Sequence, residues 1–278
     1  MLIMRNHLYF LLIFFLFSCD EETSIADNFV VEAFLFQGEP IDDVKVFKAK
    51  LYNSSDTTEE VISDAKVKII YDGANYELDY DVNSMKYVYN NNDLNIISNK
   101  KYGLEVTVND RTATSETSVP TKPIGLTLSE NKIIIPELVL SRALPTILAN
   151  LYENARAKIS WDNPNNEYHY LTIKYMGDSE NPIFSDELPA GVGNFFENFS
   201  IVSEPTKDKE YSIIGLSLKN YGRYKVSLFK INQDYVSLFE NQEQDSNELN
   251  EPPSNIINAF GVFSAFASDT TSFEIVKE

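Results

Sequence analysis

A period-two alternation of apolar and polar residues recurs along most of the chain, and it restricts the fold more than any other feature. The clearest alternating segments are Phe29–Phe36, Val44–Phe47, Val67–Ile69 and Leu104–Val108. Such alternation places the apolar side chains on one face of a β-strand. The turn pairs Asp72-Gly73 and Asn109-Asp110 separate these segments at short intervals, a spacing typical of β-sandwiches and not of βαβ units. The sequence therefore predicts an all-β protein.

The predicted strands divide into two β-sandwich domains, residues 28–120 and residues 121–278. Pro120 and Pro123 bracket a short, stiff connection, after which strands resume. In the second domain, Trp161 precedes a proline-containing turn and the alternating strand Tyr168–Tyr175. This pattern resembles the B and C strands of a fibronectin type III-like sandwich, in which Trp161 would belong to the core.

Two short helical insertions are expected in the second domain. Residues 144–152 and residues 235–239 have apolar side chains at helical spacing, and the second segment follows Asp234, a residue suited to an N-cap. We expect each helix to cover an end or an edge of the sandwich.

Residues 1–18 have the features of a lipoprotein signal peptide. Arg5 precedes an apolar run from Leu8 to Phe17. A helix of about ten residues rises about 15 Å, which is half of a hydrocarbon core of roughly 30 Å, so this run is too short to span a membrane. We interpret residues 1–18 as a cleaved targeting segment.

Cys19 follows that run and is the only cysteine of the chain. With Leu16 at −3 and Ser18 at −1 it forms a lipobox, the pattern at which exported lipoproteins are acylated. An unpaired exposed thiol is a liability in an exported protein, whereas a lipidated one anchors the protein without a transmembrane helix. The sequence therefore predicts lipid attachment at Cys19.

Residues 19–27 are expected to be an acidic tether between the lipid and the first sandwich. Asp20, Glu21 and Glu22 resemble the surface-export signal of lipoproteins from the Bacteroidetes group. An ordinary polar tether is the alternative. We therefore expect an outer-membrane protein on the cell surface, with the periplasmic face as the other location.

The charge of the chain argues against a nucleic-acid partner. Asp and Glu number 42 against 23 Lys and Arg, and the formal net charge is −19 at pH 7. Phosphate neutralisation needs patches of basic residues, and an anionic surface would repel this chain. The only membrane contact that we expect is through the N-terminal lipid.

No residue pattern indicates an active site, so the sequence predicts a non-enzyme without cofactor or metal. His169 is the one histidine outside the signal peptide, and the only thiol is the predicted lipid site, which leaves no nucleophile with a histidine base or zinc set. Asp79–Asn83 begins like a calcium loop but lacks its glycine and final glutamate. A polar hairpin is the favoured interpretation there.

Other candidate sites are a partner contact and two modification positions. Phe195, Phe196 and Phe199 follow two glycines and are predicted to contact a partner, although a core role is the alternative. The segment from Phe260 to Phe266 is a second predicted contact. Thr57 and Thr270 lie in Asp-Thr-Thr motifs, which resemble an O-glycosylation acceptor, in stretches expected to be turns.

The chain resembles a family of Bacteroidetes lipoproteins, domain-of-unknown-function family 4249. The resemblance rests on the lipobox with the strand at Phe29, the segment Ser63–Leu78, the strand Lys101–Val106 and the C-terminal Ser254–Ala265. It covers nearly the whole mature chain. Ala259-Phe260 departs from the family's glycine-rich pair, and residues 133–151 are not clearly matched. The first domain also resembles transthyretin-like or immunoglobulin-like domains.

The resemblance implies a partner, because such lipoproteins are typically encoded beside TonB-dependent outer-membrane receptors. We therefore expect an accessory subunit of such a receptor in nutrient uptake. A stand-alone ligand-binding or adhesive surface lipoprotein is the alternative. A hydrolase with a pair of catalytic carboxylates is the least favoured one.

Overall fold

The computed structural model describes residues 28–50, 58–184, 201–240 and 254–278. Fifteen strands, two α-helices and a short 3₁₀ helix are defined in that part of the chain. The elements are β1 (Phe29–Phe36), β2 (Val44–Lys48), β3 (Lys66–Tyr71), β4 (Ala74–Asp81), β5 (Lys86–Val88), β6 (Lys101–Val108), β7 (Arg111–Ser118), β8 (Ile124–Leu128), β9 (Lys132–Ile135), α2 (Leu144–Asn154), β10 (Arg156–Asp162), β11 (His169–Tyr175), β12 (Ile201–Val202), β13 (Glu210–Ile214), η3 (Gly215–Ser217), β14 (Gly222–Ile231), α4 (Gln233–Glu240) and β15 (Phe260–Lys277). The predicted all-β fold is confirmed.

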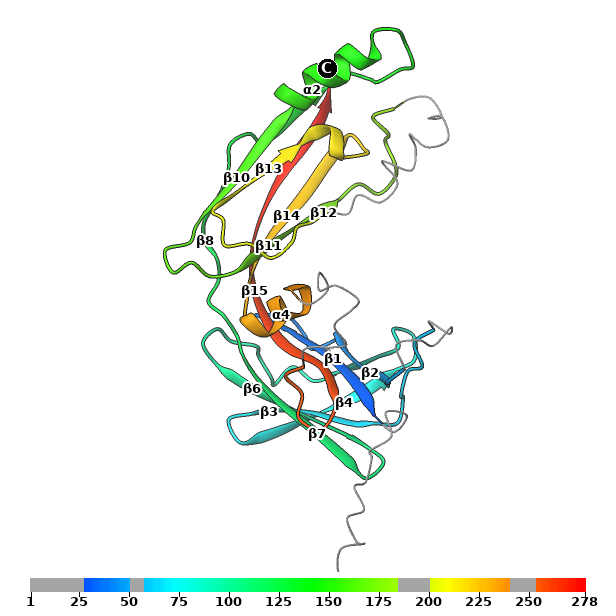
Figure 1. The fold of residues 1–278 in the computed structure, drawn as a ribbon, viewed down its shortest axis with the longest axis vertical. Helices are drawn as coiled ribbons and strands as arrows, with labels where there is room; N and C mark the ends of the chain where they lie inside the picture. The colour runs from blue at the N-terminus through cyan, green and yellow to red at the C-terminus, as the bar shows by residue number, and fades with distance from the viewer. Residues whose placement is uncertain (1–27, 51–57, 185–200, 241–253) are drawn as a thin grey trace, which may run out of the picture.

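The strands form two stacked lobes, which Figure 1 shows one above the other. We call strands β1–β7 with the beginning of β15 the first lobe, and strands β8–β14 with the rest of β15 the second lobe. In the first lobe, β1 pairs with β2 and β15, and the other layer runs β4-β3-β6-β7. Alternate residues of the two layers, such as Val31, Ile69 and Leu104, share one core.

The second lobe packs the strands β12-β11-β14-β15, with β9 beside β15, against the three-stranded sheet β13-β10-β8. Its core contains Trp161, as predicted, together with Ile159, Leu171 and Phe273. The helix α2 lies at the far end of this lobe (Figure 1), and α4 lies where the lobes meet. Because α4 begins at Gln233, Asp234 lies in its first turn and does not precede the helix.

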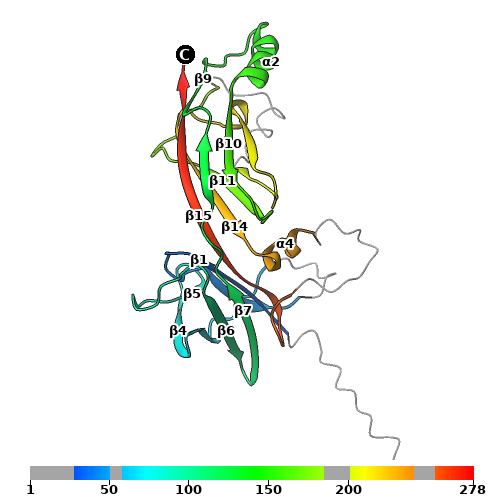
Figure 2. The ribbon, with the colours of Figure 1, turned by 90° about the vertical axis from the view of Figure 1, so that its left-hand side faces the viewer.

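One strand, β15, belongs to both lobes. Its first residues pair in parallel with β1, from Val30 with Phe260 to Phe36 with Phe266. From Phe266 onward it pairs antiparallel with β14, ending at Ile275 with Gly222, and its end runs beside β9. Figure 2 shows this long curved strand crossing the junction. Phe266 is therefore the point where the strand changes its partner from β1 to β14, within one continuous sheet.

The C-terminal segment accordingly differs from the predicted domain division, which gave all of residues 121–278 to the second domain. Ile256, Ala259, Phe263 and Ala265 lie in the core of the first lobe. Asn255 holds the segment in place, since its side chain donates to the Phe263 carbonyl (2.8 Å) and accepts from the Phe263 N–H (2.9 Å). The first core is thus completed by residues from the far end of the chain.

Candidate functional site

Aromatic side chains from both lobes form a cluster at the junction. It comprises Phe34 and Phe36 of β1, Tyr170 of β11, Phe229 of β14, Tyr235 of α4 and Phe266 of β15. Phe266 is 2% exposed, and its ring lies 5.0 Å from that of Phe36 and 4.8 Å from that of Tyr235. Tyr170 stacks on Phe229 at 4.8 Å, and burial raises its pKa. Together with the shared strand, this cluster joins the lobes into one body.

A groove of about 720 Å³ lies beside this cluster, and we call it the junction groove. Four separate segments line it: residues 99–101, residues 118–121, residues 165–168 and residues 230–233. The first two belong to the first lobe and the connection, and the last two to the second lobe. Its volume is within the range of about 300–1,000 Å³ that small-molecule sites occupy.

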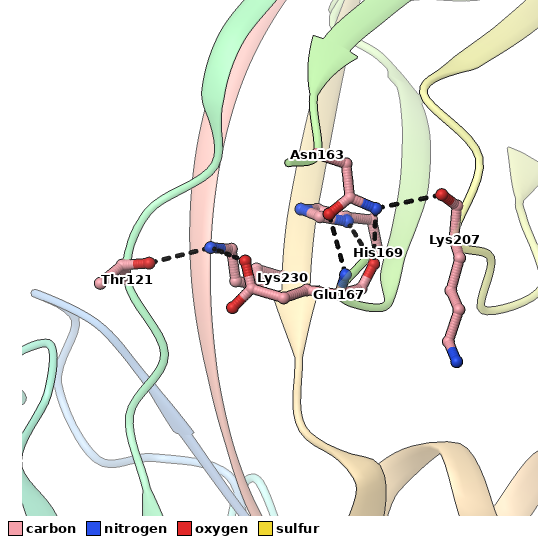
Figure 3. A network of polar contacts seen from close by, with 6 residues as sticks. All are labelled: Thr121, Asn163, Glu167, His169, Lys207 and Lys230. Carbon is pink, nitrogen blue, oxygen red and sulfur yellow. Dashed lines mark hydrogen bonds and ion pairs between the residues drawn. The ribbon is translucent and has the colours of Figure 1, made fainter. Parts of the chain in front are cut away.

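The polar network of the junction groove is organised by Lys230, which is 7% exposed. Its ammonium donates to Thr121 Oγ1 (2.8 Å) and pairs with Glu167 Oε2 (2.7 Å). Figure 3 shows Lys230 reaching from β14 to the connection between the lobes. All three residues line the groove. A buried ammonium needs such partners, because an unpaired charge costs several kcal/mol away from water.

A second polar chain ties β7 and β15 to Asn232, the groove residue between β14 and α4. Asn232 donates from its amide nitrogen to Thr117 Oγ1 (2.9 Å), and its amide oxygen accepts from Ser264 Oγ (2.5 Å). Thr117 belongs to the first lobe, and Asn232 directly precedes α4. The start of the helix is thereby fixed relative to the first lobe, at the point where Asn232 lines the groove.

The turn that presents Glu167 is held by Asn163, which is 4% exposed. The Asn163 amide nitrogen donates to the carbonyls of Glu167 (2.8 Å) and Lys207 (3.0 Å), and its oxygen accepts from the Glu167 N–H (2.8 Å). Figure 3 shows these bonds to the right of the Lys230 ion pair. The Asn163 side chain therefore holds both the backbone N–H and the carbonyl of Glu167 in place.

His169 lies in the core behind this turn. It is 1% exposed, its Nδ1 is 3.1 Å from the Glu167 carbonyl, and its Nε2 has no hydrogen-bond partner within the described ranges. Its ring lies 5.9 Å from that of Trp161. Burial lowers the pKa of His169, which the nearby Lys230 lowers further. The side chain is a neutral core residue in contact with the network.

This lowered pKa predicts a pH-dependent loss of stability. The unfolded chain takes up a proton at His169 near pH 6.5, whereas the folded chain takes it up only at lower pH. The contribution of His169 to the free energy of unfolding is therefore complete above pH 6.5. It decreases as the pH drops below 6.5, by at most about 1.4 kcal/mol per pH unit. In His169→Gln, the free energy of unfolding, measured with urea at pH 7.5, 6.5 and 5.5, should decline less with falling pH than it does in the wild-type protein. Equal slopes for the two proteins would contradict this assignment.

An acidic pocket of about 370 Å³ lies elsewhere, near Asp42, Asp43 and Asp81. Asp43 pairs with Lys86 (2.6 Å). Asp81 accepts hydrogen bonds from the Ser84 hydroxyl (2.7 Å) and from the N–H groups of Asn83 and Ser84, and these bonds lower its pKa. The segment Asp79–Asn83 is thus the end of a hairpin strand and its turn. The described part of the chain contains no group of three or more acidic, His or Cys side chains suited to a metal.

Large apolar side chains are exposed at the far end of the second lobe, around β9 and α2. They are Ile134 (59% exposed), Val139 (46%), Leu140 (51%) and Tyr152 (51%). We call these four residues the distal apolar patch.

Most of the site residues predicted from the sequence lie outside the described residues: Cys19, Asp20, Glu21, Glu22, Thr57, Phe195, Phe196 and Phe199. Thr270 is described, and it lies exposed within β15, opposite Ser227, and not in a turn. In the predicted contact segment Phe260–Phe266, Phe263 is 0% exposed and Phe266 is 2% exposed. The prediction that this segment offers aromatic side chains to a partner is therefore wrong for these two, because both complete cores.

Sequence reasoning missed the junction groove. The only local signal was a lysine between the apolar residues Phe229 and Ile231 at the end of a strand, which indicates a buried, partnered charge. Nothing in the sequence brings residues 99–101 next to residues 230–233. In the described part of the chain, no helix has the length and apolar character needed to cross a membrane.

Comparison with known proteins gives a family and distant structural neighbours. A family model described as "Domain of unknown function (DUF4249)" matches residues 16–272. No curated protein matches the chain. The central fibronectin-III array of RIM-binding protein is 11% identical, with a TM-score of 0.24, and the match covers 89% of this chain and 68% of that one. A structure concerned with host cell surface retention of a 1.5-MDa bacterial ice-binding adhesin is 10% identical, with a TM-score of 0.22, covering 90% and 65%.

Proposed function

Since the chain belongs to the DUF4249 family, a domain of unknown function, we propose from its own features that it is a non-enzymatic surface lipoprotein of the outer membrane. In this proposal Cys19 carries the lipid, Asp20, Glu21 and Glu22 direct export to the cell surface, and the protein serves as an accessory subunit of a TonB-dependent receptor in nutrient uptake. Thr57 and Thr270 stay predicted O-glycosylation positions, and the Phe195–Phe199 segment stays a predicted contact.

The observation that carries the proposal is the axial layout created by β15. Val30, close to the start of the described chain, pairs with Phe260 at the beginning of this strand. Lys277 at its end pairs with Ile135, beside the distal apolar patch. A strand from Phe260 to Lys277 covers about 55 Å at about 3.3 Å per residue. The end nearest the predicted anchor and the distal apolar patch thus lie at opposite ends of the molecule.

This layout suits a tethered partner protein. The eight residues between Cys19 and Asn28 reach at most about 30 Å, so a lipid at Cys19 would keep the first lobe close to the membrane. The joined lobes would then hold the distal apolar patch farther out, towards the extracellular parts of a neighbouring receptor. Confinement of both proteins to one membrane raises their effective concentration, so a modest interface suffices.

The test is affinity purification from gently solubilised outer membranes, using tagged wild-type protein and a tagged Cys19→Ala variant. The wild-type protein should carry a fatty-acid label and recover a large β-barrel receptor in near-stoichiometric amount. The variant should lose the label, leave the membrane fraction and recover no receptor. Its unchanged body makes it the matched control for tag and detergent.

Two outcomes would count against the proposal. A variant that stays labelled and membrane-bound would remove Cys19 as the anchor. Repeated recovery of the wild-type protein alone, in detergents that preserve known receptor complexes, would favour the stand-alone ligand-binding or adhesive lipoprotein.

A further inference from the structure

We propose that the junction groove is a binding site for a small polar molecule that carries one carboxylate, of the kind presented by the C-terminus of a short peptide. Lys230 and Lys101 are the cations that receive the carboxylate. The site is independent of the proposed receptor, since all of its groups belong to this chain.

The first argument is the incomplete set of partners around Lys230. An ammonium has three N–H donors. Thr121 and Glu167 accept two of them, at 2.8 and 2.7 Å, and no third acceptor lies within the described ranges of the chain. Lys230 also lines the groove, so its remaining donor is available to a ligand bound there. A buried donor left without a partner is costly, and an acceptor from a ligand in the groove would satisfy it.

The second argument is the local charge. The groove is lined by Lys101 and Lys230 against one carboxylate, Glu167, whereas the whole chain has a net charge of −19. The lining therefore has one positive charge in excess on a strongly acidic protein. A single carboxylate matches that excess, while a phosphate dianion would exceed it and be repelled by the rest of the molecule.

The third argument is the remaining lining of the groove. Three residues with amide side chains, Asn99, Asn165 and Gln233, and the hydroxyl-bearing Ser118 also line the groove. Amides both donate and accept hydrogen bonds, which suits a ligand with peptide groups. Val119, Pro120 and Tyr168 supply apolar contact. Specific small-molecule sites combine a few convergent polar groups with apolar walls in this way.

Calorimetric titration of the mature protein in a mild detergent tests the proposal. The probe is N-acetyl-L-alanine, which has one carboxylate and one amide, and the matched control ligand is N-acetyl-L-alaninamide, which lacks the charge. We expect the acid to bind with at least about tenfold higher affinity than the amide, since a hydrogen bond to a charged group accounts for about that factor.

Three variants locate the binding. Lys101→Met should weaken binding of the acid about tenfold, and so should Lys230→Met combined with Glu167→Gln, which removes both charges of the buried pair together. Lys132→Met is the control, because Lys132 is a 61% exposed lysine in a long ion pair with Glu274 outside the groove, and it should leave binding unchanged.

The proposal is overturned if the acid does not bind or binds no better than the amide. It is also overturned if inorganic phosphate binds more tightly than the acid, or if both groove variants, folded by circular dichroism, bind as the wild-type protein does.

Discussion

Replacing Gly261 by Ala should lower the free energy of unfolding by about 3 kcal/mol or more. Gly261 has a φ of 114°, a region that residues with a side chain avoid at a cost of about 1–3 kcal/mol. An added Cβ would also lie 2.0 Å from the Val31 carbonyl oxygen and 2.8 Å from the Val31 nitrogen. Those are backbone atoms of β1, so β1 and β15 would have to separate, with a further cost of about 1–3 kcal/mol.

A matched control separates the contact from the backbone conformation. Gly38 also has a positive φ, 76°, but an added Cβ meets nothing within 4 Å. Gly38→Ala should therefore cost only about 1–2 kcal/mol. Urea unfolding of both variants, followed by tryptophan fluorescence and far-UV circular dichroism, measures the difference. Equal losses for the two would mean that close packing of β15 on β1 adds nothing to stability.

The second large effect is expected at the buried ion pair. In Glu167→Gln the Lys230 ammonium keeps its hydrogen bond to Thr121 but loses its counter-charge. Only 8% of the Lys230 side chain is exposed, so water cannot replace that counter-charge fully. Removing one member of a buried pair costs about 3–5 kcal/mol. The Glu167 side chain is 37% exposed, so water screens part of this charge, and we expect a loss of about 2–3 kcal/mol.

The double variant Lys230→Met with Glu167→Gln should recover most of that loss, because no charge is then left unpaired. Methionine preserves the unbranched apolar stem of lysine and adapts to irregular space. Thermal unfolding of the two single variants and the double variant completes the cycle. If the stability losses of the two single variants add up in the double variant, the two side chains act independently. The ion pair would then not stabilise the connection between the lobes.

These two regions explain how two sandwiches behave as one body. Near Gly261 the strand β15 is pressed against β1 of the first lobe, and beyond Phe266 the same strand is paired with β14 of the second. Lys230 then connects β14 to Thr121 in the segment between the lobes. The second of these connections borders the junction groove, since Lys230 and Thr121 both line it.

Local sequence was sufficient for most elements. The alternation in Phe29–Phe36 and Leu104–Val108 predicted β1 and β6, and the Asp72-Gly73 pair predicted the turn that joins β3 and β4. Asp72 and Gly73 both have positive φ, a conformation that this pair adopts readily. Trp161 was predicted to be in the core and is 3% exposed. Each of these features is decided by residues within a few positions of one another.

The predictions about β15 failed for a physical reason. Phe260, Phe263 and Phe266 do not alternate on one face, and from this the sequence suggested exposed aromatic side chains. In the structure Phe263 enters the first core, and Phe266 enters the cluster between the lobes. A strand that contributes to two hydrophobic clusters follows the requirements of both, so its apolar residues cannot follow a single period.

The amino-acid sequence by itself therefore determined the all-β class, the positions of strands and turns, and the strongly acidic charge, because alternation, turn residues and composition act locally or as sums. Only the tertiary structure decided that the C-terminal strand completes the first lobe, that Lys230 is buried against Thr121 and Glu167, and that four distant segments line one groove. Those features depend on pairings across more than a hundred residues, such as Val30 with Phe260, which are selected by how whole sheets pack and not by any neighbouring residue.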